Sequence, residues 1–344
     1  MTGSRAGSSL VEFLVSTAIA GVLTSVAMAS ILQVLRTATE EGHRTEADEE
    51  IKLTAEWLAA SVRGVGGDAL SPWMALHVEQ DVAMGRTDRV TWAGVDPDQT
   101  ACRLGAHDGR DGYALDFDAG TAACCLDDEL ADRQAMLVTP EGEAWRSLQI
   151  ASVDVDRDGC SVSFSDLGVQ PAGSRVASSG LLRANDRLPA VADVDAAFEQ
   201  ATLLVVDVQR LSLDPSTHEL RLEEDRAPLD GRLESRVVLD RVHDLQVALG
   251  YDCHPRDGRV TNAGDASDEW LGNAPGDALG HQGLTDARSD DLRMVTLGFV
   301  HGSPTRGPDA NAVRLLDGEV LTTPSVLLRA HTTRVAFRHL VQLR

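Results

Sequence analysis

The first residues of this sequence place a carboxylate close to a potential new amine. Gly7 and Ser8 lie just before a run, 13–35, that holds no charged residue. A cut after Gly7 would leave a free amine on Ser8 and make Glu12 the fifth residue of the shortened chain. In a helix these two groups lie about one turn apart. A carboxylate beside hydrocarbon needs a cation, so we predict that Glu12 pairs with the terminal amine of a neighbouring copy and fixes the stagger of packed helices. Alternatively, Glu12 simply lies in the headgroup layer of a membrane.

The uncharged run is long enough to cross a bilayer, which takes about 20 apolar residues in a helix. A secretory signal carries its small-residue cleavage site behind its apolar core. Here the small residue, Gly7, stands in front of the run, after a short leader whose one basic residue is Arg5. The sequence therefore predicts that residues 1–7 are removed and that 8–35 stay on the mature chain as a transmembrane or filament-core helix.

A second group of carboxylates has the spacing of a cation site. Asp154-x-Asp156-x-Asp158-Gly159 matches the opening of a calcium-binding loop. In a strand the first two carboxylates point to the same face, and the third lies in the turn that follows. Position twelve of such a loop is Ser165 instead of glutamate, and the flanking segments read as strands. The group is therefore either a calcium site or a solvated hairpin tip, and calcium is the one cofactor that we expect, if there is any.

Composition argues against catalysis and against nucleic acid as a partner. The chain carries 54 acidic and 31 basic residues, a net charge of −23. Such a surface repels phosphate backbones and anionic lipid headgroups. There is no Gly-x-Ser-x-Gly, His-Glu-x-x-His or Gly-x-x-x-x-Gly-Lys motif, and the ten histidines are scattered singly along the chain. We therefore expect a protein that is not an enzyme.

Five cysteines follow the apolar run. They are Cys102, Cys124, Cys125, Cys160 and Cys253. If the head lies outside the cytoplasm, disulfides are permitted. A bond from Cys102 to Cys124 or Cys125 would close a short loop and contribute about 3 kcal/mol. The odd count leaves at least one thiol unpaired, and buried free thiols are the alternative.

The elements that must position these groups begin with one long helix. Its outer part, 36–66, turns polar but keeps one apolar face, which consists of Ile51, Ala55, Leu58, Val62 and Val65. The glycines of 64–67 end the helix. A helix over 9–63 is on the order of 80 Å long, more than twice the thickness of a bilayer core. Its outer apolar face therefore needs a sheet or a neighbouring molecule.

The remainder, 67–344, reads as a β-rich head. Alternating apolar residues on both sides of residues 157–159 predict one hairpin, and those on both sides of 214–217 predict another. Two long loops, 253–290 and 302–325, are candidate contact surfaces for partners. Hairpins that follow a single long helix indicate an α+β fold in which antiparallel sheet covers the outer half of the helix.

The amino-terminal motif resembles a known family. Gly-Ser-Ser-Leu-Val-Glu followed by an apolar helix is similar to the class III signal of type IV prepilins and pseudopilins. The resemblance implies that a dedicated prepilin peptidase cuts after Gly7 and methylates the new amine of Ser8, where the family usually has Phe. It also implies that Glu12 recruits the subunit to a growing filament.

Downstream segments resemble the large minor pilins of the PilW type. These segments are 207–213, 218–222, 242–252, 292–300 and 333–338. The resemblance implies a pilin-like fold and a minor pilin that helps to start a type IV pilus and stays at or near its tip, with roles in adhesion and twitching motility. The implied partners are the major pilin, other minor pilins, a tip adhesin of the PilY type, the prepilin peptidase and the inner-membrane assembly platform. The head would lie in the periplasm before assembly and on the pilus at the cell surface afterwards.

Two other functions fit the sequence. One is a minor pseudopilin of a type II secretion system, similar to the J type, which uses related machinery. The other is a membrane-anchored extracytoplasmic binding module, with or without calcium, that never polymerises. For that module, unlike a filament subunit, replacing Glu12 with alanine would be harmless.

Overall fold

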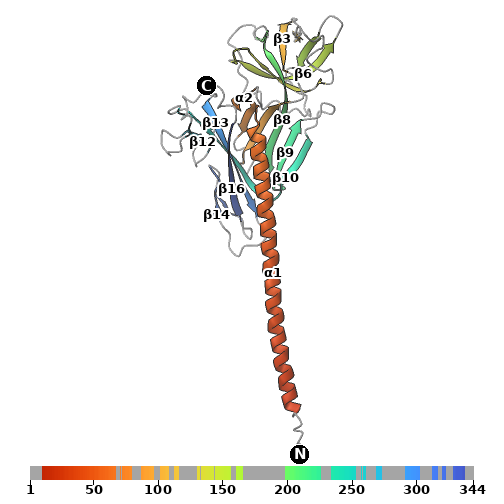
Figure 1. Cartoon of the computed structure of the whole chain (residues 1–344), viewed down its shortest axis with the longest axis vertical. Coiled ribbons are helices and arrows are strands. Elements are labelled where there is room, and N and C mark those ends of the chain that lie inside the picture. The colour runs from red at the N-terminus through yellow and green to blue at the C-terminus, as the bar shows by residue number, and fades with distance from the viewer. Residues whose placement is uncertain are drawn as a thin grey trace, which may run out of the picture.

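The computed structural model describes most of the helix and the strands of the head. The described residues are 10–66, 70, 72–79, 87–96, 101–107, 112–115, 130–131, 133–142, 144–155, 160–165, 198–225, 234–252, 257, 259–260, 269–272, 291–302, 312–316, 320–322 and 328–337. In these ranges a single long helix carries a β-rich head at its carboxyl end (Figure 1). The α+β class predicted from the sequence is confirmed.

Helix α1 runs without a break over Leu10–Arg63. In the turn that follows the helix, Gly66 adopts φ +80°, a conformation that favours glycine. A Cβ atom at Gly66 would lie 2.3 Å from the carbonyl oxygen of Leu70, and the Gly66 amide donates to Ala93 O at 2.9 Å. The predicted glycine stop is therefore also the point at which the chain turns back onto the sheet, through the short helix α2 (Pro72–Ala75).

Most strands belong to one antiparallel sheet. Its strands are β1 (Leu76–Glu79), β2 (Arg89–Val95), β3 (Cys102–His107), β4 (Gly112–Leu115), β5 (Gln134–Val138), β6 (Trp145–Val155), β7 (Cys160–Ser165), β8 (Thr202–Asp214), β9 (Glu219–Asp225) and β10 (Glu234–Leu239). Both hairpins expected from sequence are confirmed. Strand β6 pairs with β7 through Val155↔Cys160, and β8 pairs with β9 through Asp214↔Glu219.

Part of this sheet closes on itself. Strands β3, β4, β7, β6 and β5 pair in that order, and the two end strands of the series both pair with the first half of β8. The result is a six-stranded barrel at the end of the head farthest from the start of α1 (Figure 1). Apolar side chains fill the barrel, including Leu104, Ile150, Phe198 and Leu203. Closure leaves β8 as the one strand shared by the barrel and the open part of the sheet.

A second sheet forms the other part of the head and packs against the open part of the first sheet. It has the order β12 (Trp270–Leu271), β11 (Val242–Tyr251), β13 (Leu292–Gly302) and β16 (Leu328–Ala336). The two-stranded pair of β14 (Ala312–Val313) and β15 (Leu321–Thr322) packs near it, with Leu315 against Gly298. The long segments 253–290 and 302–325 thus carry short strands.

Residues just before β2 join the two sheets. The Asp88 amide donates to Leu245 O at 2.8 Å, and the Asp88 carboxylate accepts the Val247 amide at 2.8 Å. The Thr87 hydroxyl both donates to Leu245 O and accepts the Leu245 amide. These side chains satisfy the backbone of β11 that β12 leaves unpaired, so Thr87 and Asp88 are buried polar residues with a structural role.

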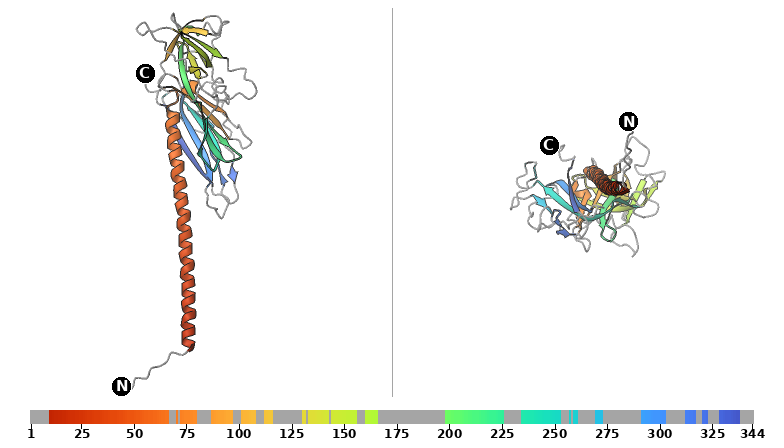
Figure 2. Two further views of the ribbon diagram at one scale, coloured as in Figure 1. Left: turned by 90° about the vertical axis from the view of Figure 1, so that its right-hand side faces the viewer. Right: turned by 90° about the horizontal axis from the view of Figure 1, so that it is seen from below.

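One hydrophobic core holds the helix and both sheets together. It includes Ile51, Leu58 and Val62 of α1 with strands of each sheet, and Ala55 packs at its margin. The helical face expected from the sequence is confirmed, because Ile51, Leu58, Val62 and Val65 are buried and Ala55 is partly buried. Figure 2 shows the outer half of α1 along one side of the head, with the inner half projecting beyond it.

Candidate assembly helix

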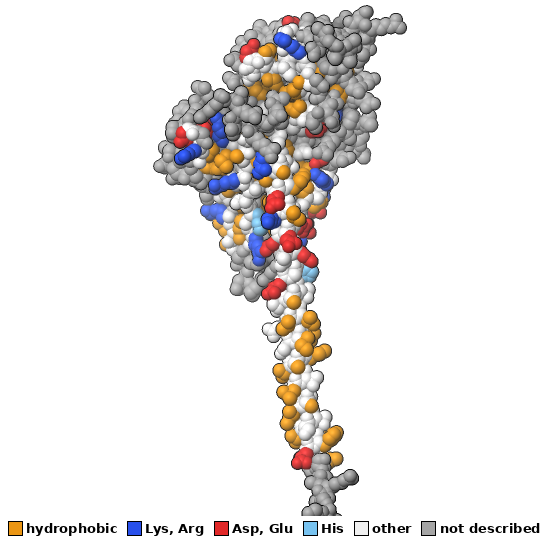
Figure 3. Space-filling model, in the orientation of Figure 1, with side chains coloured by type: hydrophobic (Ala, Val, Ile, Leu, Met, Phe, Trp, Pro, Cys, Tyr) orange, Lys and Arg blue, Asp and Glu red, His pale blue; other side chains and the backbone are white. Residues whose placement is uncertain are grey.

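The projecting half of α1 is a continuous apolar surface without a cover. Every side chain from Leu10 to Leu35 is exposed, and in Figure 3 hydrophobic side chains gather along the helix below the head. The large ones are Leu10, Val11, Phe13, Leu14, Val15, Ile19, Val22, Leu23, Val26, Met28, Ile31, Leu32, Val34 and Leu35. Burying a side chain of this size stabilises by about 1.5–3 kcal/mol, so covering these 14 is worth on the order of 20–40 kcal/mol. Water is therefore not the medium of this segment.

Four hydroxyl side chains of this segment are compatible with hydrocarbon. The hydroxyls of Thr17, Thr24, Ser25 and Ser30 each donate to the carbonyl oxygen four residues earlier, at 2.8–3.0 Å. A hydroxyl bonded in this way adds no unsatisfied donor to an apolar environment. By length and composition α1 is the one helix among the described residues that could cross a membrane.

Glu12 lies in the first turn of α1. A carboxylate at this place faces the positive end of the helix dipole, and its side chain stands next to exposed apolar residues on both sides along the chain. Gly7 and Ser8 lie outside the described residues. The cleavage, the methylation of Ser8 and the pairing of Glu12 with a neighbour's amine therefore stay predictions.

A polar stretch separates the apolar run from the head. The first buried residue of α1 is Ala47, so 36–46 projects below the head and spans about 16 Å. His43 and Glu46 approach each other there at 3.6 Å. A polar stretch of helix thus stands between the apolar run and the head.

Contacts from both sheets fix α1 to the head. Arg329 of β16 donates to both carboxylate oxygens of Asp48, at 2.6 and 2.7 Å. On the other side, Arg236 of β10 lies over the ring of Trp57 at 5.0 Å and pairs with Glu224 at 3.0 Å. Each contact is modest alone. Together with the buried face they make the helix and head one body.

The proposed calcium group is described only in part. Asp154 is exposed on β6 and its carboxylate accepts a hydrogen bond from Ser152 at 3.3 Å. Asp156 and Asp158 lie outside the described residues. Within the described ranges no three His, Cys, Asp or Glu side chains are grouped so that they could hold a metal ion. Calcium binding stays a prediction.

Two cysteines of the barrel are oxidised. Cys102 and Cys160 are both disulfide-bonded, and both are buried. The free-thiol alternative is therefore wrong for these two. Cys124 and Cys125, the predicted partners of Cys102, lie outside the described residues, so the pairing stays a prediction. Sequence reasoning did not select Cys160. Its alternation with Val162 and Phe164, which are also buried, was the available signal.

The sequence also gave no sign that four of its scattered histidines lie in one part of the head. His218 and His243 have ring centroids 4.4 Å apart. His301 lies one strand away from His243 on β13, and His331 lies on β16 beside the Asp48–Arg329 pair. They come from three strands and a turn that are far apart in the chain, so only tertiary structure brings them near one another.

No family model and no curated protein matches this chain. Among solved structures, a type IV-like pilin from Thermus thermophilus is similar over 86% of this chain and 98% of its own, at 11% identity and a TM-score of 0.35. A TM-score this low carries no functional argument, so the proposed function is based on the geometry of the helix and the head.

Proposed function

We propose that this chain is a pilin-like subunit whose apolar half-helix packs among equivalent helices in the core of a filament. More specifically, we propose a minor pilin that helps to start a type IV pilus and sits at or near its tip with other minor pilins and a tip adhesin. The observation that carries the proposal is the apolar segment of α1, exposed on all sides and continuous with a helix that is built into the head.

Rigid continuity favours assembly over simple anchoring. A tethered binding module needs only a membrane span and a linker to the head, and that linker need not be rigid. In this chain one unbroken helix, 10–63, joins the apolar segment to the core of the head. The position of each head is then set by the position of its helix, which is what an ordered filament requires. This favours a subunit over the membrane-anchored binding module.

Oxidised cysteines support a head outside the cytoplasm. Disulfides such as those of Cys102 and Cys160 persist in oxidising compartments and are rare in the cytosol. With the apolar segment crossing the inner membrane, the head would lie in the periplasm until assembly moves it to the cell surface. The prepilin peptidase, the assembly platform and the major pilin are the partners that this route requires.

Processing and incorporation test the proposal together. In the native host, Gly7→Leu is expected to retain residues 1–7, which the intact mass reports. Glu12→Ala is expected to give a processed, inserted subunit that is missing from sheared filaments. Glu46→Ala, which removes an exposed carboxylate farther along the same helix, is the matched control and should be incorporated normally.

The outcome separates the candidate functions. Loss of surface pili on deletion of the gene supports the minor pilin, and loss of exoprotein release with normal pili supports the secretion pseudopilin. A Glu12→Ala variant that is as active and as abundant in every fraction as the wild type would instead support the anchored binding module. A mature chain that is freely soluble and begins beyond Leu35 would refute all three.

A further inference from the structure

We propose that His243, His301 and His331, with His218 beside the first of them, form an acid-sensitive latch at the base of the head, which holds the sheet of β11, β13 and β16 and helix α1 together near neutral pH and loosens when the imidazoles of His243, His301 and His331 gain protons. The inference is independent of which filament or membrane the helix enters. It rests on where these rings lie, on what surrounds them and on the contact between β16 and α1.

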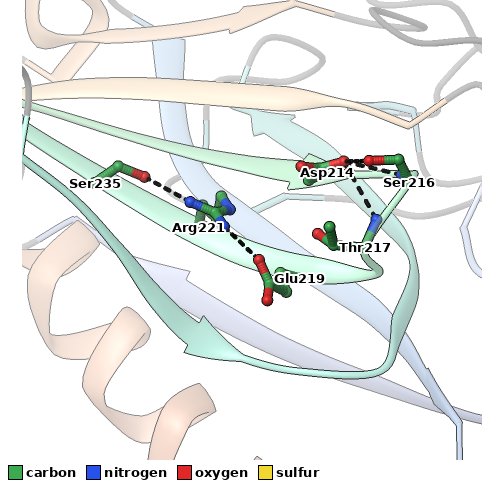
Figure 4. A network of polar contacts seen from close by, with 6 residues as sticks. All are labelled: Asp214, Ser216, Thr217, Glu219, Arg221 and Ser235. Carbon is green, nitrogen blue, oxygen red and sulfur yellow. Dashed lines mark hydrogen bonds and ion pairs between the residues drawn. The ribbon is translucent and has the colours of Figure 1, made fainter.

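Two turns bring the first pair of rings together. The turn after β8 is fixed by Asp214, whose carboxylate accepts the amide and hydroxyl of Ser216 and the amide of Thr217 (Figure 4). His218 ends this turn, and its carbonyl accepts the amide of Val242 at 2.8 Å. That bond ties the turn to the start of β11, where His243 lies with its ring centroid 4.4 Å from that of His218.

The next ring is enclosed. His301 of β13 is 2% exposed, and its Nε2 atom has no hydrogen-bond partner among the described residues. The Gly302 amide beside it donates to the carbonyl of Arg241, at 2.8 Å, in the turn between β10 and β11. A proton on Nε2 would become a buried donor without an acceptor. The enclosed site therefore accommodates the neutral ring and not the imidazolium.

The last ring reaches the helix. His331 of β16 stacks on Phe299 with ring centroids 5.7 Å apart, and its Nε2 atom also lacks a partner in the described part of the chain. Two residues before it, Arg329 forms the double contact to Asp48 of α1. Movement of β16 at His331 would thus act directly on the contact that joins this sheet to α1.

Burial, more than the surrounding charges, disfavours extra protons on these rings. His301 faces Arg241, Asp240, His243 and His331, and His331 faces Asp48 and Arg329. Two arginines and two carboxylates leave no negative charge in excess. Burial, then Arg241, lowers the pKa of His301 to about 4. Burial lowers the pKa of His331, against the opposing effect of Asp48, and burial followed by His218 lowers that of His243.

These shifts set the direction and size of the effect. A histidine whose pKa is lowered in the closed state takes up protons when the state opens, so acid favours opening. If His301 regains its ordinary pKa of 6.5 on opening, lowering the pH from 7 to 5 raises the opening equilibrium about twentyfold. The change occurs between pH 6.5 and about 4.

Amide hydrogen exchange of the full chain in detergent micelles tests the latch. Protection factors, corrected for the intrinsic effect of pH, are compared at pH 7 and pH 5. We expect about a twentyfold loss at Ala47–Ile51, β13 and β16, with little change in the barrel. In the double variant His301→Gln, His331→Gln the loss should be several times smaller than in the wild type, because the histidine with the largest shift is gone. His43→Gln, which changes an exposed histidine of α1, should behave as the wild type.

Three results would overturn the proposal. They are equal protection of the wild type at both pH values, a uniform loss that includes the barrel, and a double variant that responds as strongly as the wild type. If the double variant does not fold, exchange of the imidazole C2 hydrogens in the wild type decides the matter. A pKa below the ordinary value of 6.5 for both His301 and His331 would support the latch, and an ordinary pKa for either of them would refute it.

Discussion

Three leucines of α1 provide a matched test of which part of the helix stabilises the head and which part is needed for assembly. Leu23 is exposed in the apolar run, Leu53 is exposed beside the head at 66%, and Leu58 is fully buried against the sheets. Each can be replaced with alanine, which removes the same atoms from the same helix and slightly favours helix formation. Differences between the three variants then report the surroundings of each side chain.

The structure sets the expected magnitudes. Leu58 belongs to the core that joins α1 to both sheets, and a buried Leu→Ala change costs about 2–5 kcal/mol in lost transfer energy and cavity formation. Leu53 buries little apolar area, so the free energy of unfolding of its variant is expected within about 0.5 kcal/mol of the wild type. Leu23 makes no contact with the head, and its variant is expected to leave the free energy of unfolding of the head unchanged.

Urea unfolding of the full chain in detergent, followed by tryptophan fluorescence, measures these differences. Trp57, Trp92 and Trp145 belong to the same core or its margin and report its loss. Incorporation into sheared filaments is measured in parallel. We expect Leu58→Ala to lower the urea midpoint, and Leu23→Ala to lower incorporation without changing that midpoint.

The reasoning fails if the order is different. A Leu53→Ala variant as unstable as Leu58→Ala would mean that another face of α1 packs on the head. A Leu23→Ala variant with a lowered urea midpoint would mean that the apolar run contacts the head. Normal incorporation of a Leu23→Arg variant, the stronger substitution at the same position, would refute burial of the run among helices.

Three further predictions concern the head. Burial lowers the pKa of His301 to about 4, so below pH 6.5 the unfolded chain binds more protons than the folded one. The free energy of unfolding should therefore fall by about 3 kcal/mol between pH 6.5 and 4. A series of urea midpoints at different pH values measures this fall, and a midpoint that does not change with pH contradicts it. Gly66→Ala places a Cβ atom against the Leu70 carbonyl at a position with positive φ, so it should lower the free energy of unfolding more than Gly142→Ala does. At Gly142, the control, φ is also positive but the added Cβ has no neighbour within 4 Å, and the expected loss is about 1 kcal/mol. Reduction of the barrel disulfides should cost about 2–5 kcal/mol and expose the barrel to proteolysis before α1; simultaneous cleavage of both would show that they do not unfold separately.

Local features of this chain were readable from the sequence. The uncharged run, the buried face at Ile51, Leu58 and Val62, and the glycine stop of α1 follow from periodicity and from backbone conformations available to few residues. The two hairpins were also predictable, because their turn residues lie between strands that alternate clearly. All of these signals lie within a few residues of the feature they specify.

Tertiary structure alone decided how these pieces meet. The barrel closes because β8 pairs with both β3 and β5, and no local sequence pattern predicts which strands pair with each other. The contact between Asp48 and Arg329 joins residues 281 positions apart. The register of β11, β13 and β16 brings His243, His301 and His331 near one another, and a turn contact adds His218. Sequence patterns fix which face of an element is apolar, whereas the choice of neighbour depends on how all faces are buried at once.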